Sequence, residues 1–264
     1  FGDNVEIINP VKDDRLENFA DQFFQLRQRK GVSKSIAMES MRNNNYFGAM
    51  LLKNEHVDGM LNGLIEPYAA SVKPILETLG TIGDHALSGT QMISYKKKLY
   101  FFSDCTINVS PNAEQMAHIA YHTAQIAKEY TEDTIRLAFL SFSSYGSNRH
   151  PITGKISDAC HLLEAMNPDF QFDGEIQADV ALNDELRRTE FPFANIDGQA
   201  NVLIFPDLMS ANISYKILAN LTDASSFGPI LRGPTKPAHV LERGASVEEV
   251  INMIYLTANQ WARC

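Results

Sequence analysis

HVLERGASVEEVINM, residues 239–253, holds the end of an extended segment and the start of a helix. Ser246 is followed three positions later by Glu249, and an apolar run begins directly after this pair. The serine hydroxyl can accept a hydrogen bond from the Glu249 amide while the glutamate reaches back to the Ser246 amide, which is a capping box. The stretch therefore predicts a loop that leads into a helix starting after Ser246.

Helical and strand patterns alternate through the rest of the chain. Short, continuous apolar runs are typical of strands buried on both faces of a parallel sheet, and here each is followed by a helical pattern. Met92–Tyr95 and Leu99–Ser103 flank three lysines and predict a hairpin. This alternation predicts an α/β fold with mainly parallel sheets. Helical patterns cover residues 13–30, 68–79, 112–130, 156–166 and 210–221, and buried-strand patterns cover residues 137–142 and 202–205.

The composition is that of a globular protein, with 44% apolar and 21% charged residues among 264. A net charge of −9 argues against nucleic acid and anionic membranes as general partners, because phosphates attract basic surfaces. Three widely spaced cysteines suit reduced thiols. No apolar stretch approaches the ~20 residues that span a bilayer. These features predict a cytoplasmic protein.

Seven runs of residues, spread over nearly the whole chain, resemble the phosphotransacetylase family in the family's own order. The runs are LRQRKGVS (26–33), FFSDCTIN (101–108), LSFSSYGS (140–147), FDGEIQADVAL (172–182), ANVLIFPDL (200–208), ANISYKI (211–217) and GPILRGPTKP (228–237). The resemblance implies two α/β lobes with coenzyme A in the cleft between them. By this resemblance, residues 1–85 and 239–264 form the first lobe and residues 86–238 the second. The family's opening strand–helix units have no counterpart here, so we expect this chain to be part of a longer polypeptide.

The resemblance also suggests residues for acetyl transfer from acetyl phosphate. The phosphate-binding arginines of active members correspond to Arg27 and Lys73, and the arginine after the active-site serine corresponds to Arg243. The family's partly buried cysteine corresponds to Cys105. Two catalytic positions differ, because the serine position holds Glu242 and the aspartate position holds Glu249. A carboxylate at Glu242 would repel a phosphate, so the catalytic site reads as degenerate.

A second group of residues is expected to bind acetyl-coenzyme A. The family's lysine on the helix after the Phe-Pro-Asp strand end corresponds to Lys216, whereas a later arginine is replaced by Asn220. Backbone amides at the start of that helix could bind phosphate oxygens. Without the resemblance, this segment also fits an ordinary strand–loop–helix connection with Lys216 exposed to solvent. The remaining candidates are Ser143, Asp207, Asn212 and Arg232.

Two other patterns resemble ligand-binding motifs but lack residues that such motifs need. His118 and His122 lie four apart on one helix, but no third ligand accompanies them, so no metal site is predicted. Thr153-Gly154-Lys155 lacks the upstream glycine and the following serine or threonine of a phosphate-binding loop.

Two hypotheses follow. A Pro-x-His-Val-Leu run followed by Asn-Met resembles the C-terminal domain of hybrid malic enzymes, which predicts a non-catalytic, acetyl-coenzyme A-sensing domain that forms a homodimer within a larger assembly. NADP and a divalent metal (Mg or Mn) would then bind only in a malic enzyme part absent from this chain. The alternative is an active phosphate acetyltransferase, favoured by the retention of Arg27, Arg243 and Lys216. A weaker third possibility is a domain that only mediates assembly.

Overall fold

A computed structural model describes residues 4–82 and 87–262. The chain divides into two compact units, one made of Phe1–Ile82 with Pro234–Cys264 and the other of Gly83–Gly233. Strands and helices alternate in both units, and most strand pairs are parallel, so the predicted α/β class is confirmed. No described helix is long and apolar enough to cross a membrane.

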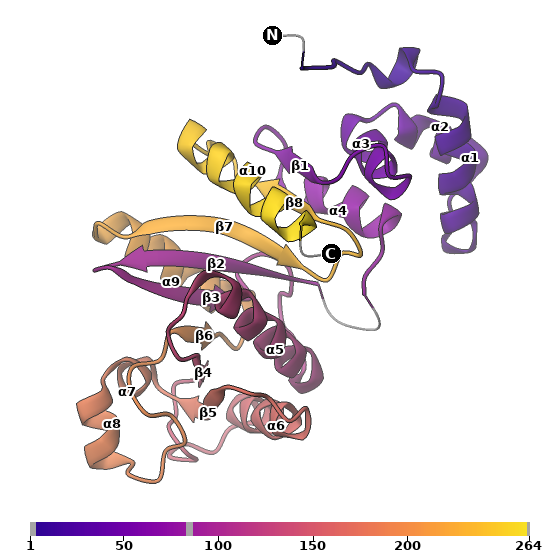
Figure 1. Ribbon diagram of the computed structural model, residues 1–264. Coiled ribbons are helices and arrows are strands. Elements are labelled where there is room, and N and C mark those ends of the chain that lie inside the picture. Colours follow the sequence, from indigo (N-terminus) through magenta and orange to yellow (C-terminus); the bar gives the residue numbers. More distant parts are fainter. Residues whose placement is uncertain (1–3, 83–86, 263–264) are drawn as a thin grey trace. The chain divides into compact units, whose positions relative to one another are not determined.

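The first unit is built around two short parallel strands (Figure 1). Strand β1 (Met60–Gly63) pairs with β8 (Ala238–Leu241), with Met60 opposite Ala238 and Gly63 opposite Leu241. Successive side chains of β1 point to opposite faces: Asn62 donates a hydrogen bond to Ser71 O at 3.0 Å, whereas Leu61 lies on the side of the C-terminal helix. Its helices are α1 (Leu16–Arg27), α2 (Lys34–Met41), α3 (Asn44–Lys53), α4 (Tyr68–Thr78) and α10 (Val247–Trp261), with 3-10 turns η1 (Pro10–Lys12) and η2 (Gln28–Lys30).

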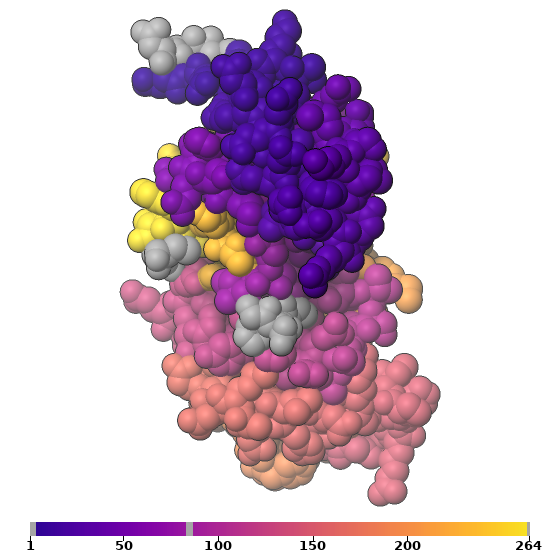
Figure 2. Space-filling view, turned by 90° about the vertical axis from the view of Figure 1, so that its right-hand side faces the viewer, coloured from indigo at the N-terminus to yellow at the C-terminus, as the bar shows by residue number. Residues whose placement is uncertain are grey.

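The N-terminal helices pack around buried aromatic and methionine side chains. Phe19 and Phe23 of α1 contact Met41, Phe47 and Met50 from α2 and α3. The helix predicted over residues 13–30 is real but shorter, because η2 tightens its last turn before Gly31, whose φ is +85°. Figure 2 shows the face of this unit on which the N-terminal segments, in indigo, form the surface.

The second unit is built on a six-stranded mixed sheet with the order β5-β4-β6-β3-β2-β7. The pairs β5–β4, β4–β6 and β6–β3 are parallel, and β2 is antiparallel to both neighbours. The strands are β2 (Ser88–Tyr95), β3 (Lys98–Ser103), β4 (Arg136–Leu140), β5 (Gln171–Ile176), β6 (Val202–Ile204) and β7 (Ser225–Arg232). The helices are α5 (Ala113–Tyr130), α6 (Pro151–Ala165), α7 (Ala178–Leu182), α8 (Asp184–Glu190) and α9 (Leu208–Leu221).

Several predicted elements are confirmed. Helix α5 begins with a capping box in which Gln115 N donates to Asn112 Oδ1 at 2.8 Å. Strands β2 and β3 form the predicted hairpin, and Lys96 and Lys97 at its tip have positive φ angles of 49° and 63°. Helix α6 begins at Pro151, five positions before the predicted Ile156, because His150 and Thr153 cap it.

Candidate functional site

The carboxyl ends of four parallel strands meet along one edge of the second unit's sheet. Ligands of open α/β sheets bind outside this edge, because the loops and helix N-termini gather there. Strand β3 leads into Cys105, β4 into Ser143 and β6 into Asp207, while Glu175 lies near the end of β5. Three candidates chosen from the sequence, Cys105, Ser143 and Asp207, therefore lie at the same edge of the sheet as Glu175.

Asp207, Asn212 and Cys105 are brought together at this edge by hydrogen bonds. The Asp207 carboxylate caps α9 by accepting from Ser210 N at 2.8 Å. One turn later, Asn212 Nδ2 donates to Cys105 O at 3.3 Å, which ties the start of α9 to the loop after β3. In this first turn of α9 the amides of Leu208 and Ser210 already donate to Val109 O and to the Asp207 carboxylate, so the anion site expected at this helix start is largely occupied by the protein itself.

Lys155 joins this group, although it was not among the residues selected from the sequence. Its Nζ donates to Pro206 O at 3.0 Å, next to Asp207. Burial lowers the pKa of Lys155, and the charge of Asp207 opposes that shift. Lysines with perturbed pKa values often lie at functional sites. In the sequence, Lys155 stands out only as part of the Thr153-Gly154-Lys155 run.

The loop after β4 is organised by a buried carboxylate. Glu175 Oε1 accepts from Ser143 Oγ at 3.1 Å and from Gly146 N at 2.8 Å. The Ser143 hydroxyl is fully buried and also accepts from Asn148 N at 3.0 Å. Ser143 therefore shapes the loop from within. A cavity of about 440 Å³ lies beside this loop and the start of α6, and Arg149 and His150 are among the residues that line it.

Cys105 is a buried residue. It has no exposed surface, and its thiol donates to Phe102 O at 3.2 Å. The preceding carboxylate, Asp104, accepts from the amides of Gly89, Thr106 and Asn108 at 3.1, 2.9 and 2.8 Å. Burial raises the pKa of Asp104, while these hydrogen bonds oppose the shift. Together the two side chains hold the loop after β3 in place.

The two cations predicted to bind coenzyme A differ in their surroundings. Lys216 is exposed on α9, and its Nζ lies 4.8 Å from the centre of the Tyr215 ring. Arg232 forms an ion pair with Glu129, and each side chain is 23% exposed. Lys216 is therefore accessible to a ligand, whereas a phosphate would have to compete with Glu129 for Arg232.

In the first unit, β1 and β8 also end at a common edge. Arg243, just after β8, donates from Nε to Ile65 O at 3.1 Å and so connects the two loops of this edge. Glu242 is half-buried beside it. The capping box predicted for α10 is confirmed, with Ser246 N donating to Glu249 Oε2 at 2.6 Å and Glu249 N to Ser246 Oγ at 3.2 Å.

Helix α4 carries Lys73, and Arg27 of α1 forms an ion pair with this helix. Arg27 pairs with Glu77 at 3.0 Å, and Tyr46 Oη donates to the same carboxylate at 2.5 Å. Burial and this hydrogen bond raise the pKa of Tyr46. Lys73 is exposed on α4, one turn before Glu77. Glu77 lies nine positions after Tyr68, the first residue of α4, so the Arg27 pair lies about 13 Å along the helix from its N-terminus.

Among the residues that the structure describes, no group of three or more His, Cys, Asp or Glu side chains is arranged to hold a metal ion.

Comparisons with known proteins identify the family. Residues 2–258 match the family described as "Phosphate acetyl/butaryl transferase". A phosphate acetyltransferase of Thermoanaerobacterium thermosaccharolyticum is 36% identical over 97% of this chain and 80% of its own length. The Escherichia coli K12 phosphate acetyltransferase is 32% identical over the whole chain and 37% of its own length. A phosphotransacetylase structure from Streptococcus pyogenes superposes with a TM-score of 0.93 at 35% identity, covering all of this chain and 81% of that one.

These relatives contradict the expectation of a regulatory malic enzyme domain. They are named phosphate acetyltransferases, and they lend no support to a malic enzyme, an oxidoreductase or NADP. That expectation gave too much weight to the local run around Glu242. The chain belongs to the phosphate acetyl/butaryl transferase family.

Proposed function

We propose that this chain transfers an acyl group between an acyl phosphate and the thiol of coenzyme A. The observation that supports this best is the 36% identity, over 97% of the chain, to a protein named phosphate acetyltransferase. Acetyl phosphate is the expected acyl donor, and butyryl phosphate is a second candidate because the family description includes both acyl groups.

The reaction sets clear requirements on the protein. The thiol loses its proton, sulfur attacks the acyl carbon, the carbon–oxygen bond to phosphate breaks, and inorganic phosphate leaves. A base must accept the thiol proton, cations must hold the phosphate, and donors must stabilise the oxyanion that develops on the acyl oxygen. No redox partner is consumed.

The first unit supplies candidates for the phosphate and for the base. Arg243 is fixed at the strand edge by Ile65 O and leaves its terminal guanidinium nitrogens for a phosphate. Lys73 adds an exposed positive charge on α4. Glu249 is the candidate base, since its carboxylate is held in place by the capping box and one of its two oxygens is used there.

The second unit supplies candidates for coenzyme A. Lys216 is exposed and would donate to a phosphate group of coenzyme A, and the start of its helix α9 is held in place by Asp207 and Asn212. Lys155 lies in the same group through its contact with Pro206. Its ammonium form would add a further donor to an anion bound at this edge.

A direct assay tests the proposal. The chain is mixed with acetyl phosphate and coenzyme A, and thioester formation and phosphate release are both followed. We expect the two products in equal amounts, at a turnover in the usual enzyme range of ~1–10³ per second. Butyryl phosphate is run in parallel to determine acyl preference. Binding of coenzyme A without thioester formation from either donor would contradict the proposal.

A further inference from the structure

The cavity at the start of α6 is lined by polar side chains that the fold itself does not use. Its volume of about 440 Å³ is that of a small-molecule site. Asn148 and Arg149 are exposed beside it, and neither side chain forms a hydrogen bond or ion pair with another described residue. The same is true of the Ser157 hydroxyl, in the second turn of α6. Donors without a protein partner therefore gather around this cavity.

His150 adds a further donor because of the way it caps α6. Its Nδ1 accepts from Ile152 N at 3.2 Å, so in the neutral ring the proton lies on Nε2. Nε2 has no partner among the described residues and is available to a ligand. Pro151 has no N–H and the Ile152 amide is used by this cap, so the donors at the cavity are side chains rather than helix amides.

The backbone of the loop after β4 offers no competing anion site. The amides of residues 143–148 donate, in order, to Ser141 Oγ, Ser147 Oγ, Glu175 O, Glu175 Oε1, Ser144 O and Ser143 Oγ. These hydrogen bonds hold the loop in one shape and leave none of its amides for a ligand. An anion beside this loop must therefore be bound by the side chains that line the cavity.

Glu175 provides an acceptor on the same cavity. It is 5% exposed and belongs to the lining. Its Oε1 accepts from Ser143 Oγ and Gly146 N, whereas its Oε2 accepts no hydrogen bond from a described residue. A carboxylate repels an anion but accepts readily from a hydroxyl group. The lining thus combines donors for an anionic group with an acceptor for a neighbouring hydroxyl group.

Gly154 keeps the cavity open beside the helix. It lies within α6 and lines the cavity, and a Cβ at this position would meet no other atom within 4 Å. Glycine weakens a helix relative to alanine. Since neither a close contact nor a positive φ requires glycine here, the space that it leaves is available to a ligand.

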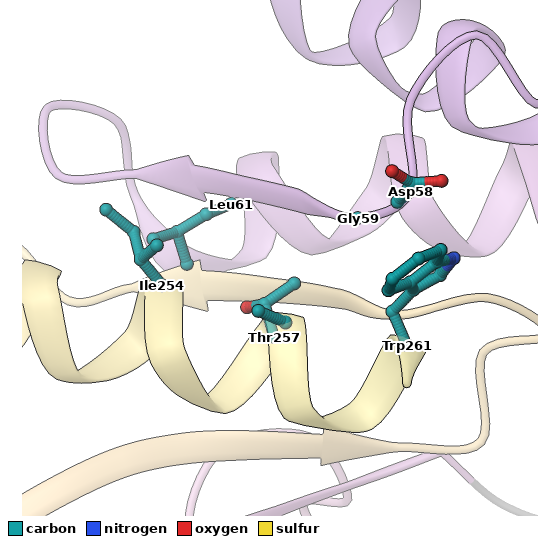
Figure 3. A pocket seen from close by; sticks show the side chains of 7 residues that line it. Asp58, Gly59, Leu61, Ile254, Thr257 and Trp261 are labelled. Carbon is teal, nitrogen blue, oxygen red and sulfur yellow. The ribbon is translucent and has the colours of Figure 1, made fainter. Parts of the chain in front are cut away.

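A second cavity, of about 380 Å³ between β1 and α10, lacks this chemistry (Figure 3). Asp58 is the only charged residue among those described around it, and Leu61, Ile254 and Trp261 give it an apolar surface. A phosphate would find no cation among those lining residues. The combination of donors and acceptor at α6 therefore distinguishes the two cavities.

We propose that the cavity at α6 binds a phosphorylated sugar ring. Arg149 holds the phosphate in two places, Asn148 and His150 donate to its remaining oxygens, and a hydroxyl group next to the phosphate donates to Glu175 Oε2. Coenzyme A carries such a group, a ribose with a 3′-phosphate and a 2′-hydroxyl, and so does a free nucleoside 3′-monophosphate. The first source rests on the proposed acyl transfer, whereas the second does not.

Isothermal titration calorimetry of the 264-residue chain with adenosine 3′-monophosphate tests the site without acyl transfer. Arg149→Met should weaken binding by roughly 10- to 100-fold, because it removes charge-assisted hydrogen bonds to the phosphate. Lys97→Met, which removes an exposed charge at the hairpin tip of the same unit, is the matched control and should leave the affinity nearly unchanged. Deoxyadenosine 3′-monophosphate, which lacks the 2′-hydroxyl, should bind the wild type more weakly than adenosine 3′-monophosphate.

Gly154→Ala separates ligand binding from fold stability. Alanine favours the helix, so this variant should melt at a higher temperature than the wild type. Its methyl group enters the cavity, so the affinity for adenosine 3′-monophosphate should fall. A residue with a purely structural role would not change stability and binding in opposite directions, and a rise in both would contradict the proposal.

Coenzyme A and dephospho-coenzyme A identify the source of the sugar phosphate. Weaker binding of coenzyme A by Arg149→Met, with dephospho-coenzyme A unaffected, is expected if coenzyme A is the ligand, whereas weaker binding of adenosine 3′-monophosphate alone is expected for a free nucleotide. Equal affinity of Arg149→Met and Lys97→Met for both ligands, or no binding of either ligand to the wild type, would overturn the proposal. Absence of thioester formation with this binding intact would contradict only the proposed acyl transfer.

Discussion

Lys216 is an exposed cation, so its substitution should change ligand binding without changing the stability of the fold. Its ammonium group stands on the surface of α9, one turn after Asn212. Lys216→Ala should weaken coenzyme A binding by roughly 10- to 100-fold, because a charge-assisted hydrogen bond contributes about 1.5–3 kcal/mol. Isothermal titration calorimetry measures the change. Lys97→Ala, at the hairpin tip, is the matched control, and equal affinity in the two variants would move the binding site away from α9.

Lys155 gives the second unit a predicted pH dependence at the residue scale. Burial lowers its pKa below the ordinary value of 10.5. At pH values between the lowered pKa of Lys155 in the folded chain and 10.5, its pKa in the unfolded chain, the unfolded chain binds more protons than the folded one. The free energy of unfolding therefore rises as the pH increases towards 10.5. Lys155→Met removes this titration. Urea unfolding at several pH values should show the advantage of the wild type over the variant growing with pH, and a constant or shrinking difference would refute the assignment.

At the scale of the element, Glu249 of helix α10 combines its observed role as a cap with the chemical role that we propose for it. Glu249→Gln can keep the capping box, since glutamine at this position also reaches the Ser246 amide, but it removes the carboxylate. We expect thermal stability close to wild type and a large loss of kcat in acyl transfer. Ser246→Ala should instead cost about 1 kcal/mol of stability with much of kcat retained. Normal turnover in Glu249→Gln would leave Glu249 as a cap only.

Elements with a strong local signal could be predicted, and those set by tertiary contacts could not. Helices α4 and α5 follow from apolar spacing and, for α5, from the Asn112 cap. Strands β1 and β8 carry only four residues each, which is too short for a pattern of apolar and polar residues to mark them. Lys155 was missed for a related reason, since its contact with Pro206 joins residues 51 positions apart. Arg27 was selected from the sequence as a candidate, but its pairing with Glu77 could not be predicted because it depends on the packing of α1 against α4.

At the scale of the whole molecule, the two units should differ in their resistance to local unfolding. The first unit holds together through two four-residue strands that are each paired on one side only, whereas the second has a six-stranded sheet whose central strands β4, β6 and β3 are paired on both sides. Short sheets with an open edge open more easily, because fewer backbone hydrogen bonds and less apolar contact hold them together.

We therefore expect amide exchange by mass spectrometry to separate the units in the 264-residue chain. Peptides that cover β1 and β8 should exchange faster than peptides that cover β4 and β6, and low urea should increase this gap. Coenzyme A should slow exchange in α9 of the second unit, because it binds only the folded form. Identical exchange free energies in both sheets would mean that the units unfold together. The unpaired edge of β1 would then have no effect on the free energy of local opening in its unit.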